Sequence, residues 1–166
     1  LRSVPAERLC VGSDAEAFVE RALLHSLAAN AAVAVGVCEA MTRMAASYTS
    51  EREQFGKPIA TFQALAHKLA DCYIDTQCLR GLTEQAVSRL TQQGVCTEAR
   101  EAVLAAKIFA TEALHRISHA SQQVHGGTGV DRDYPLFRYC LLAKKLELDF
   151  GGQSLWVQRL GAMLAA

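Results

Sequence analysis

Residues 48–71 read YTSEREQFGKPIATFQALAHKLAD, a polar connection that runs directly into a long helical pattern. Gly56 and Pro58 break any helix that precedes them. Thr61 is expected to cap the next helix. Seven residues of that helix, all but one of them apolar, recur at spacings of three and four, which marks one helical face (Phe62, Leu65, Leu69, Cys72, Thr76, Leu79 and Leu82). This stretch therefore predicts a turn between two long helices and indicates an all-α fold.

The helical period continues on both sides of this stretch. Long helices are predicted over 14–47, 61–94 and 97–125, and two shorter ones begin at Pro135 and near Gln153. Thr97 is expected to cap the third long helix, as Ser13 and Asp14 can cap the first. Apolar–polar alternation never exceeds four residues, which argues against a sheet. We expect an up-and-down four-helix-type bundle with an extra short C-terminal helix.

Composition excludes several classes of protein. Of the 166 residues, 51% are hydrophobic and 20% are charged, so the chain can bury a sizeable core and is not a disordered tail. Seventeen Lys and Arg balance 17 Asp and Glu, which leaves no net field to attract nucleic acid or an anionic membrane. The longest apolar stretch, 27–38, falls short of the roughly 20 residues that span a bilayer. It predicts a buried helix segment and no membrane span.

The six cysteines form no C-x-x-C pair, which excludes a zinc ribbon or a thioredoxin-type motif (Cys10, Cys38, Cys72, Cys78, Cys96 and Cys140). Cys38, Cys72, Cys78 and Cys140 stand among apolar neighbours in helical patterns. We expect them to be buried free thiols, which favours a reducing, cytoplasmic location.

Glu112-x-x-His115 has the spacing of a di-iron carboxylate bundle. Such a site needs a second Glu-x-x-His, which the sequence lacks, so no metal site is predicted.

Two segments carry side chains suited to binding a ligand. In the first, Arg52 can hold a phosphate while the ring of Phe55 covers an adjacent planar group. The second reads SQQVHGGTGVDRDYP over residues 121–135, and its glycines allow backbone N–H groups to approach an anion. Gln123 could donate or accept a hydrogen bond there. The segments stand at the two ends of a long helical hairpin, and the pair favours a ligand-binding role more than either segment alone.

These segments resemble the C-terminal helical domain of the FAD-dependent acyl-CoA dehydrogenases. The matching residues are R-E-Q-F-G-K-P-I-A-x-F-Q-x-L-x-x-K-L-A-D from Arg52 and Q-V-H-G-G-T-G from Gln123, with Y-P following. V-P-A-E-R-L, near the start, resembles the junction with the family's middle β-domain. The resemblance covers essentially the whole chain. It implies that 1–12 is the remainder of a linker from that missing domain and that 13–166 is the helical domain.

The resemblance also implies a cofactor and its contacts. FAD would be shared across a subunit interface, with its pyrophosphate and adenine near Arg52, Gln54 and Phe55, and with Gln63 also lining it. Its pyrophosphate would be cradled by Gln123, Val124, Gly126 and Gly127. Members of the family are homo- or hetero-oligomers that remove the α-proton and β-hydride of acyl-CoA thioesters, in pathways such as fatty acid β-oxidation. Electron-transfer flavoprotein is the electron acceptor of most relatives.

The family's catalytic glutamate has no match here. It normally follows the fourth helix, where an ungapped match places Phe150, and a slip of one residue places Asp149 or Gly151. The alternative position on the first helix falls near His25 and Ser26. No catalytic residue is assigned. Asp149 is the nearest substitute, although it is one methylene shorter and a misplacement of about 1 Å can cost 100-fold in rate.

Three functions remain open on this reading. The chain could be the FAD-contacting, oligomerising part of a dehydrogenase, inactive by itself. It could be a non-catalytic subunit of a heteromeric dehydrogenase, as in bacterial degradation of sterol side chains, while a partner supplies the base. It could also be a helical interaction module without flavin, which the intact Arg52, Phe55 and Gln123 argue against.

Overall fold

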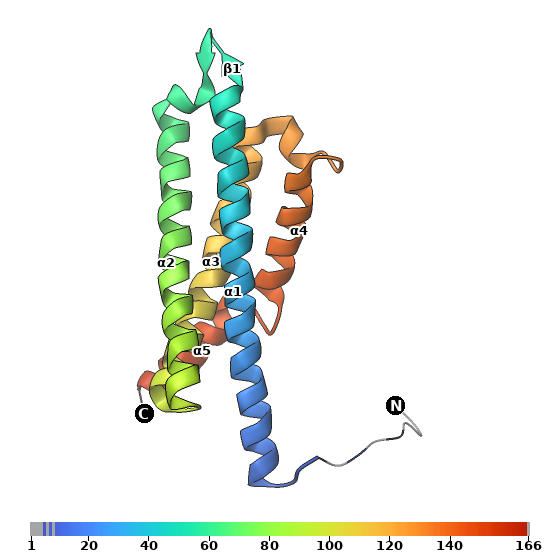
Figure 1. The fold of residues 1–166 in the computed structure, drawn as a ribbon, viewed down its shortest axis with the longest axis vertical. Coiled ribbons are helices and arrows are strands. Elements are labelled where there is room, and N and C mark those ends of the chain that lie inside the picture. Colours follow the sequence, from blue (N-terminus) through green and yellow to red (C-terminus); the bar gives the residue numbers. More distant parts are fainter. Residues whose placement is uncertain (1–4, 6, 8, 166) are drawn as a thin grey trace.

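The computed structural model describes residues 5, 7 and 9–165, and its elements are almost entirely helical (Figure 1). Five helices follow one another along the chain: α1 Ser13–Glu51, α2 Gln63–Gln93, α3 Thr97–His125, α4 Pro135–Leu148 and α5 Gln153–Leu164. The predicted all-α class is confirmed. The predicted linker 1–12 falls partly on residues outside the described ones.

The first four helices run alternately up and down, and α3 is central (Figure 1). It packs against α1, α2, α4 and α5. Its core face is built from alanines one turn apart, among them Ala106, Ala110 and Ala113, which are fully buried. Helix α1 packs against α3 and also buries small residues fully, such as Ala31 and Ala34. Small side chains let the helix backbones approach closely, so α1 and α3 form the centre of the core.

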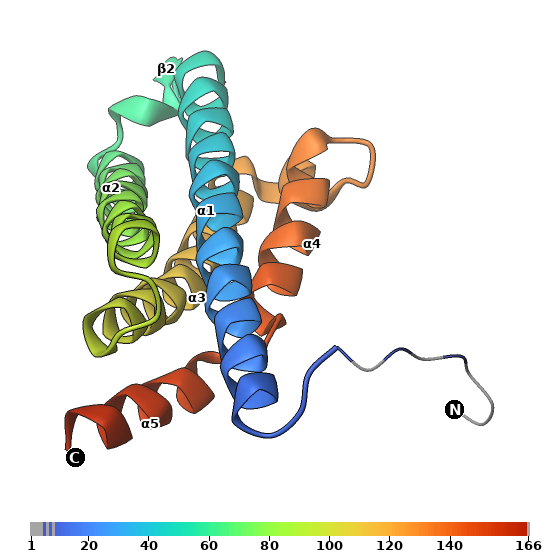
Figure 2. The same ribbon diagram turned by 60° about the horizontal axis from the view of Figure 1, so that its bottom comes forward.

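Helix α5 lies across the lower end of the bundle (Figure 2). Trp156 anchors it, because its indole is 2% exposed and is part of the main core cluster. Trp156 is therefore a core residue of the bundle.

The connection after α1 is shorter and more ordered than predicted. The sequence suggested a polar connection over 48–58, but α1 continues to Glu51 because Thr49 is fully buried and its Oγ1 donates to Ala45 O at 2.9 Å. Two short antiparallel strands follow, β1 Glu53–Gln54 and β2 Lys57–Pro58, and then the 3₁₀ turn η1 Ile59–Thr61. Polarity alone could not reveal that this segment forms a hairpin.

The helix caps also differ from the predicted ones. Thr61 lies in η1 and its Oγ1 donates to Pro58 O at 2.7 Å, while Phe62 occupies the cap position of α2. Thr97 is the first residue of α3 and Cys96 is its cap. Gly12 takes the cap position of α1, in place of Ser13 or Asp14. At the other ends, Gly94 and Gly126 terminate α2 and α3 as predicted, with φ of 70° and 60°.

The cysteines are free, and two of the four predicted to be buried are so. Cys38 and Cys72 lie in the core, and burial raises the pKa of their thiols to about 12 and about 11. Cys140 is half-buried. The prediction for Cys78 was wrong: it is exposed, because it falls on the face of α2 that points away from α1 and α3.

Helix α1 has the length and composition of a membrane span, with a mean hydropathy of 1.4 over an 18-residue window. Half of that window is buried inside the bundle, as expected for the core helix of a folded domain.

Candidate functional site

One end of the bundle brings the two sequence segments together. The C-terminal end of α1 with its hairpin, the start of α2 and the end of α3 all lie at the top in Figure 1. The ring of Tyr48 stacks on His125 with centroids 4.4 Å apart. Lys68 Nζ donates to Gln123 Oε1 at 2.5 Å. The two segments therefore lie at the same end of the bundle, and we call residues 52–63 and 123–129 the motif surface.

The hairpin presents side chains to solvent, and its one amide contact is local, since Gln54 Nε2 donates to Glu53 O at 2.8 Å. Arg52 uses its backbone locally, since its carbonyl accepts Ile59 N–H at 2.8 Å, but its side chain is exposed. Of the residues that the structure describes, no carboxylate forms an ion pair with it. Gln54 and Gln63 are also exposed. A guanidinium without a counter-ion is suited to an external anion.

Phe55 is the most exposed large apolar residue of the hairpin, at 92%. Its φ of 56° lies in the left-handed region, and Gly56 follows with φ of 76°, as a two-residue hairpin turn requires. A phenylalanine in that conformation is strained by about 1–3 kcal/mol. Its only aromatic neighbour among the described residues is Phe62, edge-on at 6.1 Å. The turn therefore holds the ring out toward solvent, where a flat ligand could cover it.

The glycines at the end of α3 leave open space. Gly126 needs its positive φ to end the helix, and its N–H donates to the carbonyls of Gln122 and Gln123. Gly127 has no positive φ, and a Cβ there would meet nothing within 4 Å. The fold of this chain therefore does not require glycine at 127. The missing side chain instead lets a group outside the chain come close to the backbone there. Val124 is 6% exposed, which leaves mainly its backbone for any contact.

Gly129, in the 3₁₀ turn η2 Gly126–Val130, is a packing requirement. A Cβ at this position would lie 2.7 Å from Gln122 O, the backbone carbonyl that helps to end α3. We expect Gly129→Ala to lower the free energy of unfolding by about 2 kcal/mol, because the carbonyl must move. Urea unfolding checks this, with Gly127→Ala as the matched control that should change stability little. Equal stability of the two variants would contradict the prediction.

His125 links the motif surface to the start of α4, a role that the sequence alone did not suggest. It is 3% exposed, and its Nδ1–H donates to Ser121 O at 2.7 Å. Its Nε2 therefore accepts from Tyr134 Oη at 3.3 Å. Burial lowers its pKa, against the opposing effect of the Ser121 hydrogen bond, so the ring is neutral at pH 7. With Tyr48 stacked on it, His125 joins the ends of three helices. The one feature of the sequence that could have indicated this role is the place of His125 between Gln123 and Gly126.

The turn at residues 149–152 is the segment in which the sequence suggested a base. Asp149 ends α4, and its carboxylate pairs with Lys145 of the same helix. Phe150 has φ of 63° and is 49% exposed. The other position considered is equally engaged: His25 Nδ1–H donates to Arg21 O, and Ser26 Oγ donates to Ala22 O, both at 2.8 Å. No free carboxylate is therefore offered at either place.

The described residues contain no group of three metal-ligating side chains. Glu112 pairs with Arg116, and His115 Nδ1 lies 3.6 Å from Glu147 Oε2.

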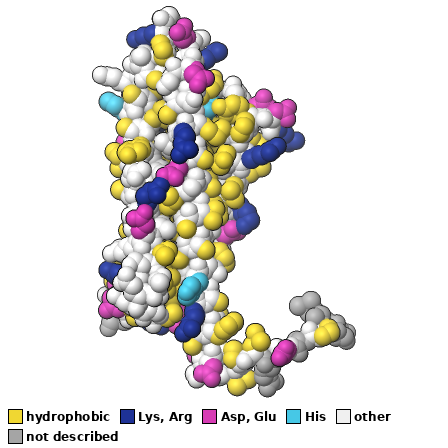
Figure 3. Space-filling view, viewed as in Figure 1, with side chains coloured by type: hydrophobic (Ala, Val, Ile, Leu, Met, Phe, Trp, Pro, Cys, Tyr) yellow, Lys and Arg dark blue, Asp and Glu magenta, His cyan; other side chains and the backbone are white. Residues whose placement is uncertain are grey.

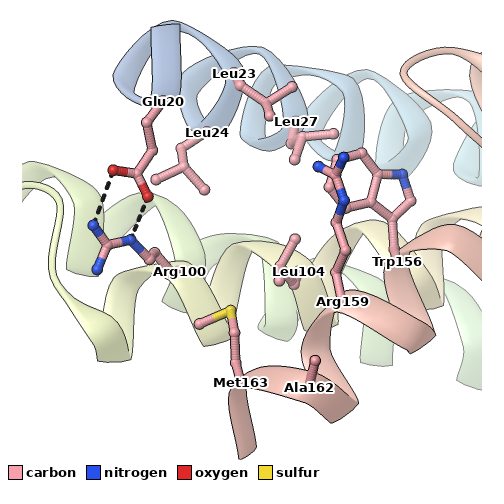
Figure 4. Close-up of a pocket in the computed structure, with 10 residues that line it drawn as sticks. All are labelled: Glu20, Leu23, Leu24, Leu27, Arg100, Leu104, Trp156, Arg159, Ala162 and Met163. Carbon is pink, nitrogen blue, oxygen red and sulfur yellow. Dashed lines mark hydrogen bonds and ion pairs between the residues drawn. The ribbon is translucent and has the colours of Figure 1, made fainter. Parts of the chain in front are cut away.

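A cavity of about 290 Å³ lies between α1, α3 and α5, at the end of the molecule opposite the motif surface (Figure 4). Its wall is apolar and includes Leu23, Leu27, Leu104, Trp156 and Met163. At one side Arg100 pairs in bidentate fashion with Glu20, with Nε–Oε1 and Nη2–Oε2 distances of 2.5 and 2.9 Å. This pair lowers the pKa of Glu20. The cavity offers few polar partners and no chemistry of its own.

Comparisons with known proteins match almost the whole bundle. The family described as "Acyl-CoA dehydrogenase, C-terminal domain" matches residues 16–154. "Acyl-CoA dehydrogenase FadE27" of Mycobacterium tuberculosis is 41% identical over 136 residues, 79% of this chain and 36% of that protein.

Solved structures give the same result. A chain of the ChsE4-ChsE5 complex from Mycobacterium tuberculosis superposes with a TM-score of 0.81 at 41% identity, covering 86% of this chain and 38% of its own length. A chain of the "Tcur3481-Tcur3483 steroid ACAD G363A variant" gives 0.82 at 43%, covering 86% and 39%. The sequence thus spans somewhat more than a third of the length of these relatives.

Proposed function

The chain belongs to the acyl-CoA dehydrogenase family, as its C-terminal helical domain, and we propose that it supplies half of an FAD site shared between subunits. The family is FAD-dependent. The observation that carries the proposal is the motif surface, where an unpaired guanidinium, an exposed ring and an open glycine backbone lie at one end of the bundle. The apolar cavity near α5 lacks the donors that a pyrophosphate needs.

Each part of the motif surface suits one part of FAD. Arg52 would hold the pyrophosphate by charge-assisted hydrogen bonds, and Phe55 would cover the adenine, with Gln54 and Gln63 beside it. The backbone at Gly126 and Gly127, with Gln123 and Val124, would approach the same phosphates. FAD, when bound, supplies the acceptor for the hydride of α,β-dehydrogenation. The chain's contribution is to bind and orient it.

We propose further that this chain supplies no catalytic base and acts in a heteromeric enzyme whose partner does. Asp149 is paired with Lys145, and Phe150 stands where an ungapped match places the family's glutamate. The two solved relatives described above are named as pairs of proteins, which fits a heteromer. The name of the second contains the word steroid, so we propose a steroid acyl-CoA thioester as the substrate class of the assembled enzyme. We propose electron-transfer flavoprotein as its electron acceptor.

The exposed apolar residues of α4 are consistent with assembly. Leu141 and Leu148 are 59% and 61% exposed, and Val130, which precedes α4, is 63% exposed. Figure 3 shows apolar side chains gathered over α4 on the face of the molecule seen in Figure 1. Patches of this kind mark protein–protein contacts.

Arg52→Ala is expected to weaken FAD binding by the assembled complex roughly 10- to 100-fold, because a charge-assisted hydrogen bond contributes about 1.5–3 kcal/mol. Flavin fluorescence and absorbance report binding by this chain, by a candidate full-length partner and by their mixture. Arg89→Ala is the matched control, since this half-buried arginine lies near the far end of α2 and its Nη1 donates to Glu98 O at 3.0 Å. It should bind FAD normally.

FAD binding that requires both chains supports a shared site. Unchanged affinity in Arg52→Ala, with assembly intact, would remove Arg52 from it. Absence of binding in every mixture that assembles would favour the flavin-free interaction module instead.

A further inference from the structure

A lysine lies in the centre of the bundle and forms no ion pair with a carboxylate of the described residues. Lys107, on α3, is fully buried. Its Nζ donates to Asn30 Oδ1 on α1 at 3.0 Å and to the carbonyl of Leu146 on α4 at 2.8 Å. A buried ammonium is costly, and an apolar side chain of similar length would fill the same volume without that cost. Packing alone therefore does not explain why a lysine occupies this position and contacts these two acceptors.

The carbonyl that Lys107 contacts belongs to the last turn of α4, where no further helical N–H is available. Asp149 N–H donates to Lys145 O at 2.9 Å, and Gly151 N–H donates to Leu148 O at 3.1 Å. Leu146 O is instead satisfied by Lys107 and, at 3.4 Å, by Asn30 Nδ2. Side chains from two other helices thus complete the end of α4.

The chain then turns sharply. Phe150 and Gly151 have φ of 63° and 103°, so this turn is conformationally demanding. On its far side Trp156 Nε1 donates to Gly151 O at 3.0 Å. The turn 149–152 is therefore held from both directions, by Lys107 and Asn30 before it and by Trp156 after it.

We infer that Lys107 and Asn30 form a buried clasp that positions the turn 149–152 relative to the bundle. The clasp rests on the proposed function in one respect. The family resemblance places the catalytic glutamate, which removes the α-proton of the substrate, at this turn. In this chain the clasp would set how Phe150 is presented to the rest of the assembled enzyme. Lys107 is a positioning residue, because it reaches the turn only through the end of α4.

Hydrogen–deuterium exchange of the 166-residue chain tests the clasp without flavin or partner. In Lys107→Met we expect amides of the last turn of α4 and of 149–152 to exchange about tenfold faster, the factor that one lost hydrogen bond of this strength gives. Amides of α2 should keep their protection. The matched control is Leu114→Ala, a fully buried residue of the same helix, which should loosen the bundle without singling out this turn.

Asn30→Ala keeps the test decisive if Lys107→Met does not fold, and it should loosen the same amides by a smaller factor. Unchanged protection of 149–152 in the variants that fold would overturn the clasp, as would a loss of protection with the same distribution as in Leu114→Ala. FAD uptake in the mixed complex reports on the opposite end of the bundle. Failure of flavin binding and failure of the clasp are therefore seen separately.

Discussion

Trp156→Ala is expected to lower the free energy of unfolding by about 3–5 kcal/mol. The indole is 2% exposed, and it fixes both α5 and the turn before it, since Nε1 donates to Gly151 O at 3.0 Å. Its removal would also enlarge the cavity of about 290 Å³ that it already lines. Because Trp156 is the single tryptophan of the chain, urea unfolding is followed by circular dichroism.

Two further variants separate the causes. Trp156→Phe keeps most of the apolar bulk and loses the N–H donor, so it should cost about 1–3 kcal/mol for the unsatisfied carbonyl and the smaller ring. Val157→Ala, at a neighbouring position that is 49% exposed, should be nearly neutral. A loss below about 1 kcal/mol in Trp156→Ala would show that α5 contributes little to the cooperative unit.

Lys107 is expected to make stability rise with pH in alkaline solution. Burial lowers its pKa from 10.5 to about 8, and the charges of Asp149 and Glu147 oppose this only in part. Between pH 8 and pH 10.5 the unfolded chain holds a proton that the folded chain has released, so the free energy of unfolding increases. The increase from this group amounts to about 3 kcal/mol. Below pH 8 both states are protonated and its contribution is constant.

The measurement is the difference in unfolding free energy between the unmodified chain and Lys107→Met at pH 8 and at pH 10.5. Taking the difference cancels the titration of the other groups, including Cys72 and Cys140, whose pKa values burial raises to about 11. Lys144→Met, at an exposed lysine of α4 paired with Glu147, is the control and should show no such pH dependence. A difference that does not change with pH would mean that Lys107 ionises as it does in water.

The residues of the candidate site that face a ligand could be predicted from the sequence, but the residues that hold them in place could not. Arg52, Phe55 and Gly126 stood out because a charge, a ring and a helix-ending glycine occur in unusual local contexts. Tyr48 and His125 did not, because an aromatic residue within a helix is usually packing. Their stacking at 4.4 Å depends on how α1 lies against α3, which no local pattern records.

The sequence by itself determined the five helices and the ends of most of them. Pro135 and Gly94 set helix ends at the predicted positions, because backbone preferences act over a few neighbouring residues. Only the tertiary structure decided that Cys78 is exposed and that Lys107 is buried. Lys107 meets partners 77 and 39 positions away in the chain. Which face of a helix meets a neighbour is set by such distant contacts, since the whole core must pack at once.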